Sequence, residues 1–299
     1  MAEGRGSGGP LRRLAPAKVN LALHVTGRRP DGYHLLDALA VFADFGDCVT
    51  VTPAAEIELS LGGEFAAHAP GGAENLAWRA AALLRQAAGT DQGAHIHIDK
   101  AIPAGAGLGG GSADAAATLL ALNELWQTGW DHERLAALAV TLGADVPMCV
   151  YGRPLRARGI GEAITPLSDV PVLPLVLAWP GVTLDTGQVF AALSSRENPP
   201  LPDPPPFAGA ADLAAWLAAC RNDLEAPATR LAPVVADVLR AIRAADACLL
   251  ARMSGSGSGC FGLFTTTAAA EAAAIEIAAA QPDWWVRPTA VRPRSGISA

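Results

Sequence analysis

The sequence predicts a globular protein that mixes strands and helices, arranged as two domains or as one large domain. Its 299 residues suit two domains, and 51% of them are hydrophobic, which is ample for a buried core. Short runs of alternating apolar and polar residues, typical of strands, are interspersed with alanine-rich runs typical of helices. A glycine-rich segment at 103–116 separates one strand run from one helix run.

The N-terminal part is predicted to form strands around a turn. The run KVNLALHV, which begins at Lys18, alternates between apolar and polar residues. Pro30, Asp31 and Gly32 supply turn residues, and the apolar pattern resumes in LLDALAVFADFGDCVTV. The first thirteen residues, MAEGRGSGGPLRR, have no apolar core of the kind found in a secretory signal, so we expect a loose tail at 1–13.

Helices are expected to dominate the next part of the chain. The apolar pattern predicts helices at 74–88, 112–126 and 133–142, and a strand at 94–100. Ser112 is expected to cap the helix that it begins. The sequence GADVPMCVYG predicts a turn at Asp145 followed by a short strand. The glycine-rich segment is therefore expected at a strand-to-helix junction.

A second region is predicted to begin near Pro166, giving domains at 14–165 and 166–299. It opens with the apolar strand VLPLVLAWP and crosses a proline cluster, NPPLPDPPPF, at 198–207. This cluster is expected to be a stiff surface loop, with a role as a proline-rich ligand as the alternative. The remaining expected elements are helices near 213–220, 231–244 and 267–280 and a last strand in DWWVRPTAV.

Composition argues against several classes of function. The net charge of −7 gives no sign of nucleic-acid binding, which usually needs clustered basic residues. The five cysteines are widely spaced without a C-x-x-C pair, which argues against disulfides and zinc and favours a reducing cytoplasm. The apolar run at 170–182 is interrupted by prolines and is shorter than the roughly 20 residues of a membrane span. We expect a cytoplasmic protein with a small-molecule substrate and neither nucleic acid nor membrane as a partner.

The segment PAGAGLGGGSADAA at 103–116 is expected to bind phosphate. Glycine permits positive φ and lacks Cβ, so consecutive N–H groups can turn toward an anion, and a following helix adds its positive N-terminal end. A flexible linker is the alternative, but linkers are rarely placed between two apolar periodic segments.

Three phosphate-loop designs are compatible with glycine at these positions. Gly105, Gly107 and Gly110 satisfy G-x-G-x-x-G, but the acidic residue expected about twenty positions later is Glu124, still within the helical pattern. The P-loop needs a lysine after its last glycine, and here Gly111 is followed by Ser112. What remains is a loop that binds phosphate through backbone amides and the hydroxyl group of Ser112.

Asp145 and Lys18 are the candidates for proton transfer in phosphoryl transfer. Asp145 lies in a G-A-D-V-P turn between apolar segments, and an ordinary turn aspartate is the alternative. Lys18, one of two lysines in the chain, begins an apolar strand, and a solvated surface lysine is the alternative. A nearby lysine would keep a carboxylate ionised or lower the pKa of an acceptor hydroxyl group.

Several other residues have two interpretations. Tyr33 and His34 follow the Asp-Gly turn and either bind a ligand or are ordinary hairpin residues. His95 and His97 share a strand face without a third ligand, so we interpret them as structural. The segment at 253–264 is either a tight hairpin or a loop that packs behind the phosphate loop and narrows the nucleotide site.

Taken together, these motifs resemble the GHMP kinase superfamily over nearly the whole chain, from residue 15 to about 264. The matching segments are APAKVNLALHVTGRRPDGYH (15–34), ENLAWRAA (74–81), IPAGAGLGGGSADAA (102–116), LGADVPMCVYG (142–152), RNDLE (221–225) and RMSGSGSGCF (252–261). The glycine motif marks only the superfamily. The K-V-N-L and D-G-Y-H segments resemble the branch that phosphorylates the 2-hydroxyl group of 4-diphosphocytidyl-2-C-methyl-D-erythritol, a cytidine-diphosphate methylerythritol of the non-mevalonate isoprenoid pathway.

The resemblance implies a two-domain α+β fold, a nucleotide-binding domain followed by a smaller substrate domain, and ATP as the phosphoryl donor, with magnesium. It assigns Asp145 as catalytic base, also in contact with substrate, and Lys18 as its partner at the acceptor hydroxyl group. The other residues that it implies are Asn20, Tyr33, His34 and Phe190 for the substrate, Asn75 and Lys100 for adenine, and Pro103, Gly105, Gly107, Leu108, Gly109, Gly110, Gly111 and Ser112 for the phosphates.

Three other functions are considered besides this one. The resemblance also admits a kinase of another alcohol, such as homoserine or mevalonate, although the D-G-Y-H segment argues against it. A nicotinamide oxidoreductase and a non-catalytic nucleotide sensor are the more remote alternatives.

Ser258 and Gly259 depart from the usual third glycine motif of the family, and the tail and the proline cluster lie outside its pattern.

Overall fold

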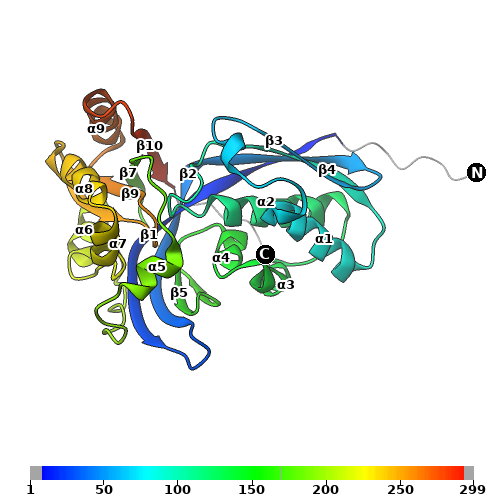
Figure 1. Cartoon of the computed structure of the whole chain (residues 1–299), viewed down its shortest axis with the longest axis horizontal. Coiled ribbons are helices and arrows are strands. Elements are labelled where there is room, and N and C mark those ends of the chain that lie inside the picture. Colours follow the sequence, from blue (N-terminus) through cyan, green and yellow to red (C-terminus); the bar gives the residue numbers. More distant parts are fainter. Residues whose placement is uncertain (1–8, 169, 293–299) are drawn as a thin grey trace, which may run out of the picture. The chain divides into compact units, whose positions relative to one another are not determined.

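Two units, interleaved along the sequence, make up the chain (Figure 1). The structure is a computed structural model that describes residues 9–168 and 170–292. The first unit contains residues 9–16, 46–104 and 110–151, and the second contains 17–45, 105–109 and the described residues from 152 onward. Strands β1 (Leu11–Arg28) and β2 (His34–Ala54) are long enough to contribute to both units. The domain boundaries at 14–165 and 166–299 stay a prediction.

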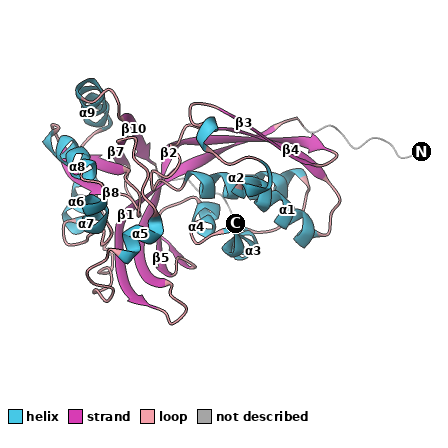
Figure 2. Ribbon diagram, in the orientation of Figure 1, coloured by secondary structure: helices cyan, strands magenta, loops and turns pink. Residues whose placement is uncertain are grey.

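The first unit has a small sheet covered by helices. The second half of β2 pairs antiparallel with β4 (Gly93–Asp99), which pairs in parallel with β3 (Ile57–Gly62). Helices α1 (Leu76–Ala88), α2 (Gly110–Leu125), α3 (His132–Ala139) and α4 (Val146–Tyr151) lie on one side of these strands (Figure 2). In α1 and α2, mostly alanine and leucine are buried, which lets the two helices pack closely.

Local sequence explains where these helices begin, and it corrects two predictions. Asn75 caps α1 because its side chain accepts a hydrogen bond from the N–H of Ala77 at 2.9 Å. Ser112 does not cap α2, because that helix already begins at Gly110 and Ser112 lies in its first turn. The strand predicted after Asp145 is wrong, since Val146–Tyr151 is helical and Pro147 is tolerated in a first helical turn. Residues 146–150 are all buried, so their apolar pattern has no period that would distinguish a buried strand from a short helix.

The second unit contains the start of the β1–β2 hairpin and a separate four-stranded sheet. The hairpin strand β2 pairs antiparallel with β5 (Leu155–Gly159), which pairs with β6 (Ala163–Pro166). The four-stranded sheet has the order β10, β7, β9, β8 and is antiparallel throughout; its strands are β7 (Leu173–Trp179), β8 (Cys248–Met253), β9 (Cys260–Phe264) and β10 (Trp285–Val291). The predicted strands in VLPLVLAWP and DWWVRPTAV are thereby confirmed and lie next to each other.

Among the described residues of this unit, five α-helices accompany the sheet, and the last two of them pack on it most extensively. They are α5 (Thr186–Ala191), α6 (Ala210–Leu217), α7 (Glu225–Leu231), α8 (Val234–Ala244) and α9 (Thr267–Ala280). Helices α8 and α9 contribute Val235, Leu239, Ile242 and Ile277 to a core that also contains Phe264. The helix predicted at 231–244 is interrupted, because α7 ends at Leu231 and Pro233 precedes a new helix. The helix at 267–280 is confirmed.

The predicted tail at 1–13 is wrong at its last three residues. Residues 11–13 belong to β1, where Arg13 forms an ion pair with Glu124 at 2.6 Å. Residues 1–8 of the predicted tail lie outside the described residues.

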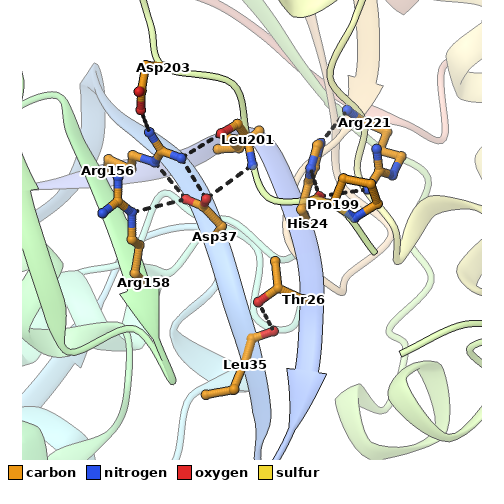
Figure 3. A network of polar contacts seen from close by, with 10 residues as sticks. All are labelled: His24, Thr26, Leu35, Asp37, Arg156, Arg158, Pro199, Leu201, Asp203 and Arg221. Atoms are coloured by element: carbon orange, nitrogen blue, oxygen red, sulfur yellow. Dashed lines mark hydrogen bonds and ion pairs between the residues drawn. The ribbon is translucent and has the colours of Figure 1, made fainter. Parts of the chain in front are cut away.

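A buried histidine, His24, connects three segments of the second unit (Figure 3). Its Nε2 atom accepts a hydrogen bond from the backbone N–H of Arg221 at 3.1 Å. The remaining proton must therefore sit on Nδ1, which donates to the carbonyl oxygen of Pro199 at 2.9 Å. Burial lowers the pKa of His24, because the charged imidazolium is poorly solvated there. The structure therefore requires the neutral form.

We expect the stability that His24 contributes to depend on pH. Above its unfolded-state pKa of about 6.5 the side chain is neutral in both states. As the pH falls below this value the unfolded state takes up a proton more readily than the folded state, so the contribution decreases. Urea unfolding of wild type and His24→Gln at pH 7.5 should give a difference of about 1–3 kcal/mol for the lost hydrogen bonds. At pH 5.5 the difference should be smaller; a constant or larger difference would contradict this account.

Candidate functional site

The glycine-rich loop takes a backbone conformation that only glycine adopts easily. The angle φ is 74° at Gly105, 76° at Gly107 and 69° at Gly109. At each of these positions a Cβ atom would be strained. Glycine alternates here with Ala106 and Leu108, and both of these side chains are buried. The backbone of the loop therefore follows a tight series of turns.

A second glycine loop packs against the first one. Residues 254–259 form the turn between β8 and β9, which confirms the predicted hairpin. The N–H of Gly259 donates to the carbonyl oxygen of Ala106 at 2.9 Å, and the hydroxyl group of Ser254 donates to that of Gly107 at 3.2 Å. A Cβ atom on Gly257 would collide with the backbone of Gly107. The hairpin thus also packs on the glycine-rich loop, as the alternative interpretation predicted, whereas its narrowing of a nucleotide site stays a prediction.

Lys18 and Asn20 lie next to these loops on β1. The N–H of Lys18 donates to the carbonyl oxygen of Leu108 at 2.8 Å, and a Cβ atom on Gly109 would lie 3.1 Å from the Cβ of Lys18. The N–H of Asn20 donates to the hydroxyl group of Ser254 at 3.1 Å. Within the described part of the chain, the buried Oδ1 atom of Asn20 has no hydrogen-bond partner. Such an acceptor is costly unless a ligand supplies a donor.

An aromatic pair lies at the turn of the β1–β2 hairpin. The rings of His34 and Phe190 are stacked, with centroids 4.7 Å apart and planes at 25°. Burial, followed by the charges of Arg28 and Arg196, lowers the pKa of His34, so its ring is neutral at pH 7. Its Nε2 atom is buried and has no partner among the described residues. Tyr33 is 61% exposed beside it. A neutral ring with an unused nitrogen can stack on and hydrogen-bond to a planar base.

In the first unit, the predicted adenine residues Asn75 and Lys100 are already engaged. Both polar atoms of the Asn75 side chain are used, since its amide group also donates to the carbonyl oxygen of Pro70 at 2.8 Å. The ammonium group of Lys100 is 4% exposed and pairs with Asp47 and Asp114. Contact of either residue with adenine stays a prediction. Because their polar atoms are already bonded, such a contact would have to come from other atoms of these two residues.

The ion cluster of Lys100, Asp47 and Asp114 fixes the two ends of the glycine segment. Asp47 accepts hydrogen bonds from the N–H groups of Ala101 and Ile102 at 2.6 and 2.7 Å, just before the loop. Asp114 lies in the second turn of α2, just after it, and accepts a bond from Lys100 at 2.6 Å. One buried cation thereby connects the segment that enters the loop to the helix that leaves it.

This cluster contains two carboxylates for one ammonium group, which has a consequence for protonation. Burial alone would lower the pKa of Lys100, but both carboxylates act against it and hold the pKa above its usual value. Burial raises the pKa of Asp114 to about 7, even with Lys100 acting in the opposite direction. Its Oδ1 atom has no partner in the described structure. The cluster is therefore expected to take up a proton as the pH falls through about 7.

The remaining predicted residues lie around the start of α2 and α4. Pro103 is buried, Gly110 and Ser112 are partly buried, and Gly111 is exposed in the first turn of α2. Asp145 is partly buried and directly precedes α4, with its carbonyl oxygen accepting a bond from the N–H of Cys149 at 3.2 Å. Lys18 and Asp145 belong to different units, and their cooperation stays a prediction.

Sequence reasoning missed Asp47 and Asp114, and it interpreted His95 and His97 correctly as structural. Both histidines hydrogen-bond to the hydroxyl group of Ser60, at 2.9 and 2.8 Å. A signal was present for Asp114, the lone acidic residue in the alanine-rich run 113–122, where an unpaired charge is costly, but Asp47 shares its apolar run with Asp37 and Asp44.

Two features are absent from the described residues. No three His, Cys, Asp or Glu side chains come together as a metal-binding group among them. No described helix is both long enough and apolar enough to cross a membrane.

Comparisons with known proteins agree on one type of protein. Family models match the GHMP kinase N-terminal domain at 75–153 and the GHMP kinase C-terminal domain at 207–282. A protein of Dinoroseobacter shibae named 4-diphosphocytidyl-2-C-methyl-D-erythritol kinase is 51% identical over 292 residues, covering 97% of this chain and 98% of its own.

Solved structures resemble the chain over the same extent. The crystal structure of a 4-(cytidine 5'-diphospho)-2C-methyl-D-erythritol kinase has a TM-score of 0.78 at 42% identity and covers 94% of this chain and 99% of its own. Homoserine kinase from Cytophaga hutchinsonii has a TM-score of 0.72 at 20% identity and covers 98% of each chain, which shows a shared fold.

We expect Gly257→Ala to disturb the phosphate loop through the second glycine loop. The new methyl group would collide with the backbone of Gly107, which has no side chain to move aside. The variant should bind ATP at least tenfold more weakly, with a lower melting temperature, since overpacking costs about 1–3 kcal/mol. Isothermal titration calorimetry with ATP measures this. Gly71→Ala is the control, because a Cβ atom there meets nothing within 4 Å; equal effects of both changes would contradict the role of the packing.

We expect the two aspartates of the ion cluster to respond differently to neutralisation. Asp47→Asn should destabilise the protein by about 3 kcal/mol at any pH from 5 to 8, because a buried cation loses a partner. For Asp114, whose folded-state pKa is raised, stability is present at low pH and is lost as the pH rises through about 7. Asp114→Asn removes this loss, so its stability relative to wild type should increase from pH 5 to pH 8. Denaturant unfolding at both pH values tests this, and a relative stability that decreases would refute it.

Proposed function

The chain belongs to the GHMP kinases and, within them, to the 4-diphosphocytidyl-2-C-methyl-D-erythritol kinase family, and from this premise we propose that it transfers the γ-phosphoryl group of ATP to the 2-hydroxyl group of 4-diphosphocytidyl-2-C-methyl-D-erythritol. The observation that carries the proposal is the 51% identity over 97% of the chain to a relative of that name. We propose that the reaction takes place in the cytoplasm as a step of the non-mevalonate isoprenoid pathway.

The glycine loop and α2 are proposed to bind the phosphates of ATP. Gly105, Gly107 and Gly109 give the loop positive φ angles with which backbone N–H groups can turn toward an anion, and Ser112 adds a hydroxyl group in the first turn of α2. The free N–H groups at the start of this 16-residue helix favour a negative charge. ATP would supply the γ-phosphoryl group, and magnesium, which usually binds substrate phosphates and water, would reduce its charge.

Lys18 and Asp145 are proposed to act on the acceptor hydroxyl group. Asp145 would accept its proton as the oxygen attacks, and Lys18 would stabilise the negative charge that develops on that oxygen. The buried Oδ1 atom of Asn20 supports a role in binding substrate, because a donor from the substrate would satisfy it. The rings of His34 and Phe190, with Tyr33 beside them, are proposed to bind the cytosine base.

The alternatives share the fold but lack this support. Homoserine kinase has the same fold at 20% identity, which does not extend to its substrate. An aromatic pair beside an unused ring nitrogen fits a base better than it fits a small aliphatic alcohol. The proposal therefore expects competition by free CDP, no inhibition by homoserine or mevalonate, and no tight binding of NADH.

We expect Asp145→Asn and Lys18→Met to lower kcat by roughly 10² or more, because each removes a group that acts on the reacting oxygen. The binding of ATP should change little. The assay measures ADP release with and without 4-diphosphocytidyl-2-C-methyl-D-erythritol. The matched control is Asp131→Asn, since Asp131 caps α3 and asparagine caps a helix equally well.

Two results would overturn parts of this proposal. If wild-type ADP release does not increase when the cytidine-diphosphate substrate is added, the substrate assignment is wrong. If Asp145→Asn turns over as fast as Asp131→Asn, Asp145 is not the base.

A further inference from the structure

The proline cluster at 198–207, to which the sequence assigned no function, is bonded to the strands beneath it (Figure 3). Leu201 is 4% exposed, and both of its backbone polar groups are used. Its N–H donates to Asp37 at 3.1 Å, and its carbonyl oxygen accepts a bond from Arg156 at 2.7 Å. A surface loop of this composition does not need buried charged partners, so these contacts require an explanation.

Asp37 on β2 and Arg156 on β5 form a buried, two-bonded ion pair. The two guanidinium-to-carboxylate bonds measure 2.8 and 2.7 Å, and the side chains are only 4% and 7% exposed. The third guanidinium nitrogen of Arg156 donates to Asp203 at 2.7 Å. Such a pair is costly to desolvate. It is also geometrically specific, because the planar guanidinium group can donate two parallel hydrogen bonds to a carboxylate in one orientation only. It therefore orders β2, β5 and the proline cluster relative to one another.

The start of the cluster is fixed to β1. Asn198 donates to the carbonyl oxygen of Val25 from its backbone N–H at 3.1 Å and from its side chain at 3.0 Å. The same side chain donates to Asp223 at 3.1 Å, and Asp223 in turn accepts a bond from the N–H of Val25 at 2.7 Å. The carbonyl oxygen of Pro199 accepts the bond from His24. Residues 198–203, which we call the strap, are thus attached to both strands of the hairpin.

The strap connects the two segments that carry the stacked aromatic pair. His34 lies three residues before Asp37, at the start of β2. Phe190 lies on α5, eight residues before Asn198. The strap therefore fixes the chain that follows Phe190 to the strands that carry His34. The hairpin turn is closed by bonds of its own, such as the one from the N–H of Arg29 to the carbonyl oxygen of Tyr33 at 2.7 Å, but these bonds lie within the turn and do not reach the segment that follows Phe190.

We propose that the strap holds His34 and Phe190 in their stacked arrangement, and that Asp37 and Arg156 are positioning residues for the pyrimidine base of the substrate. This inference rests on the proposed function, because it takes the aromatic pair as the base-binding element. Neither charged residue needs to touch the substrate. The ion pair would act by holding the two aromatic rings in place before the base binds, which lowers the entropic cost of binding.

The test compares Asp37→Asn and Arg156→Lys with a control that makes the same change elsewhere. Asp237→Asn removes a carboxylate from an exposed ion pair with Arg240 on α8, also with a bond of 2.8 Å. For each variant, steady-state kinetics gives kcat and KM for both substrates, calorimetry gives Kd for free CDP, and thermal unfolding gives Tm. Asp37→Asn and Arg156→Lys should each raise KM for the cytidine-diphosphate substrate and Kd for CDP about tenfold. Their KM for ATP should stay within twofold, and Asp237→Asn should match wild type.

Three outcomes would overturn the inference. The first is a lower Tm with unchanged KM and Kd, which would make the pair structural only. The second is an equal increase in both KM values, which would mean general damage. The third is a change in Asp237→Asn as large as in Asp37→Asn. If Asp37→Asn does not fold, Arg156→Lys alone tests the inference, because lysine keeps the positive charge but cannot form the two parallel hydrogen bonds of the guanidinium group.

His34→Ala separates a failure of this inference from a failure of the proposed function. If wild type does not use the substrate, or if His34→Ala leaves Kd for CDP unchanged, the proposed function of these rings fails and the inference fails with it. If His34→Ala weakens CDP binding and the strap variants do not, only the inference is wrong.

Discussion

The close approach of two glycine loops is the constraint on which the proposed phosphate-binding loop depends. The backbone at 105–109 takes its shape not only from its own positive φ angles but also from the turn at 254–259, whose backbone at Gly257 lies directly against that of Gly107. Hydrogen bonds from Ser254 and Gly259 hold that arrangement. Because each loop occupies the space where the other would carry a Cβ atom, neither can be redesigned independently. This explains why two glycine-rich segments about 150 residues apart occur in one chain.

Buried charge plays a comparable role at two other places. The cluster around Lys100 connects the chain before the glycine loop to the helix after it, and the Asp37–Arg156 pair connects the proline cluster to the hairpin. Neither charge cluster is needed to bury apolar surface, and both carry a desolvation cost. Their common property is directional bonding between segments that contain residues proposed to bind substrate. Specific geometry, rather than stability, is what such pairs provide here.

The sequence predicted elements with a strong local signal and failed where tertiary contacts decide. The helix at 267–280 and the strand in DWWVRPTAV follow from their composition, and so does the β8–β9 hairpin from its glycines. The helix α4 was predicted as a strand, because its buried residues show no period. The proposed roles of Lys18, Asn20 and the glycine loop come from motifs and stay predictions. The ion pairs and hydrogen bonds of Asp47, Asp114 and Asp37 were not predictable, because their partners are 14 to 164 residues distant and no local pattern identifies those partners.

The strap also has a consequence for how the chain folds. The β1–β2 hairpin is completed early in synthesis, whereas its buried partner Leu201 emerges more than 140 residues after Asp37. Until then Asp37 can pair with Arg156 and Arg158, but Leu201 and Asp203 have not yet joined the network, and the segment after Phe190 is not yet attached to the hairpin. Contacts of such sequence separation form late and slowly. A nascent chain is therefore expected to have a paired hairpin well before it has an ordered base-binding element, so competence to bind substrate would appear only when the C-terminal half has emerged.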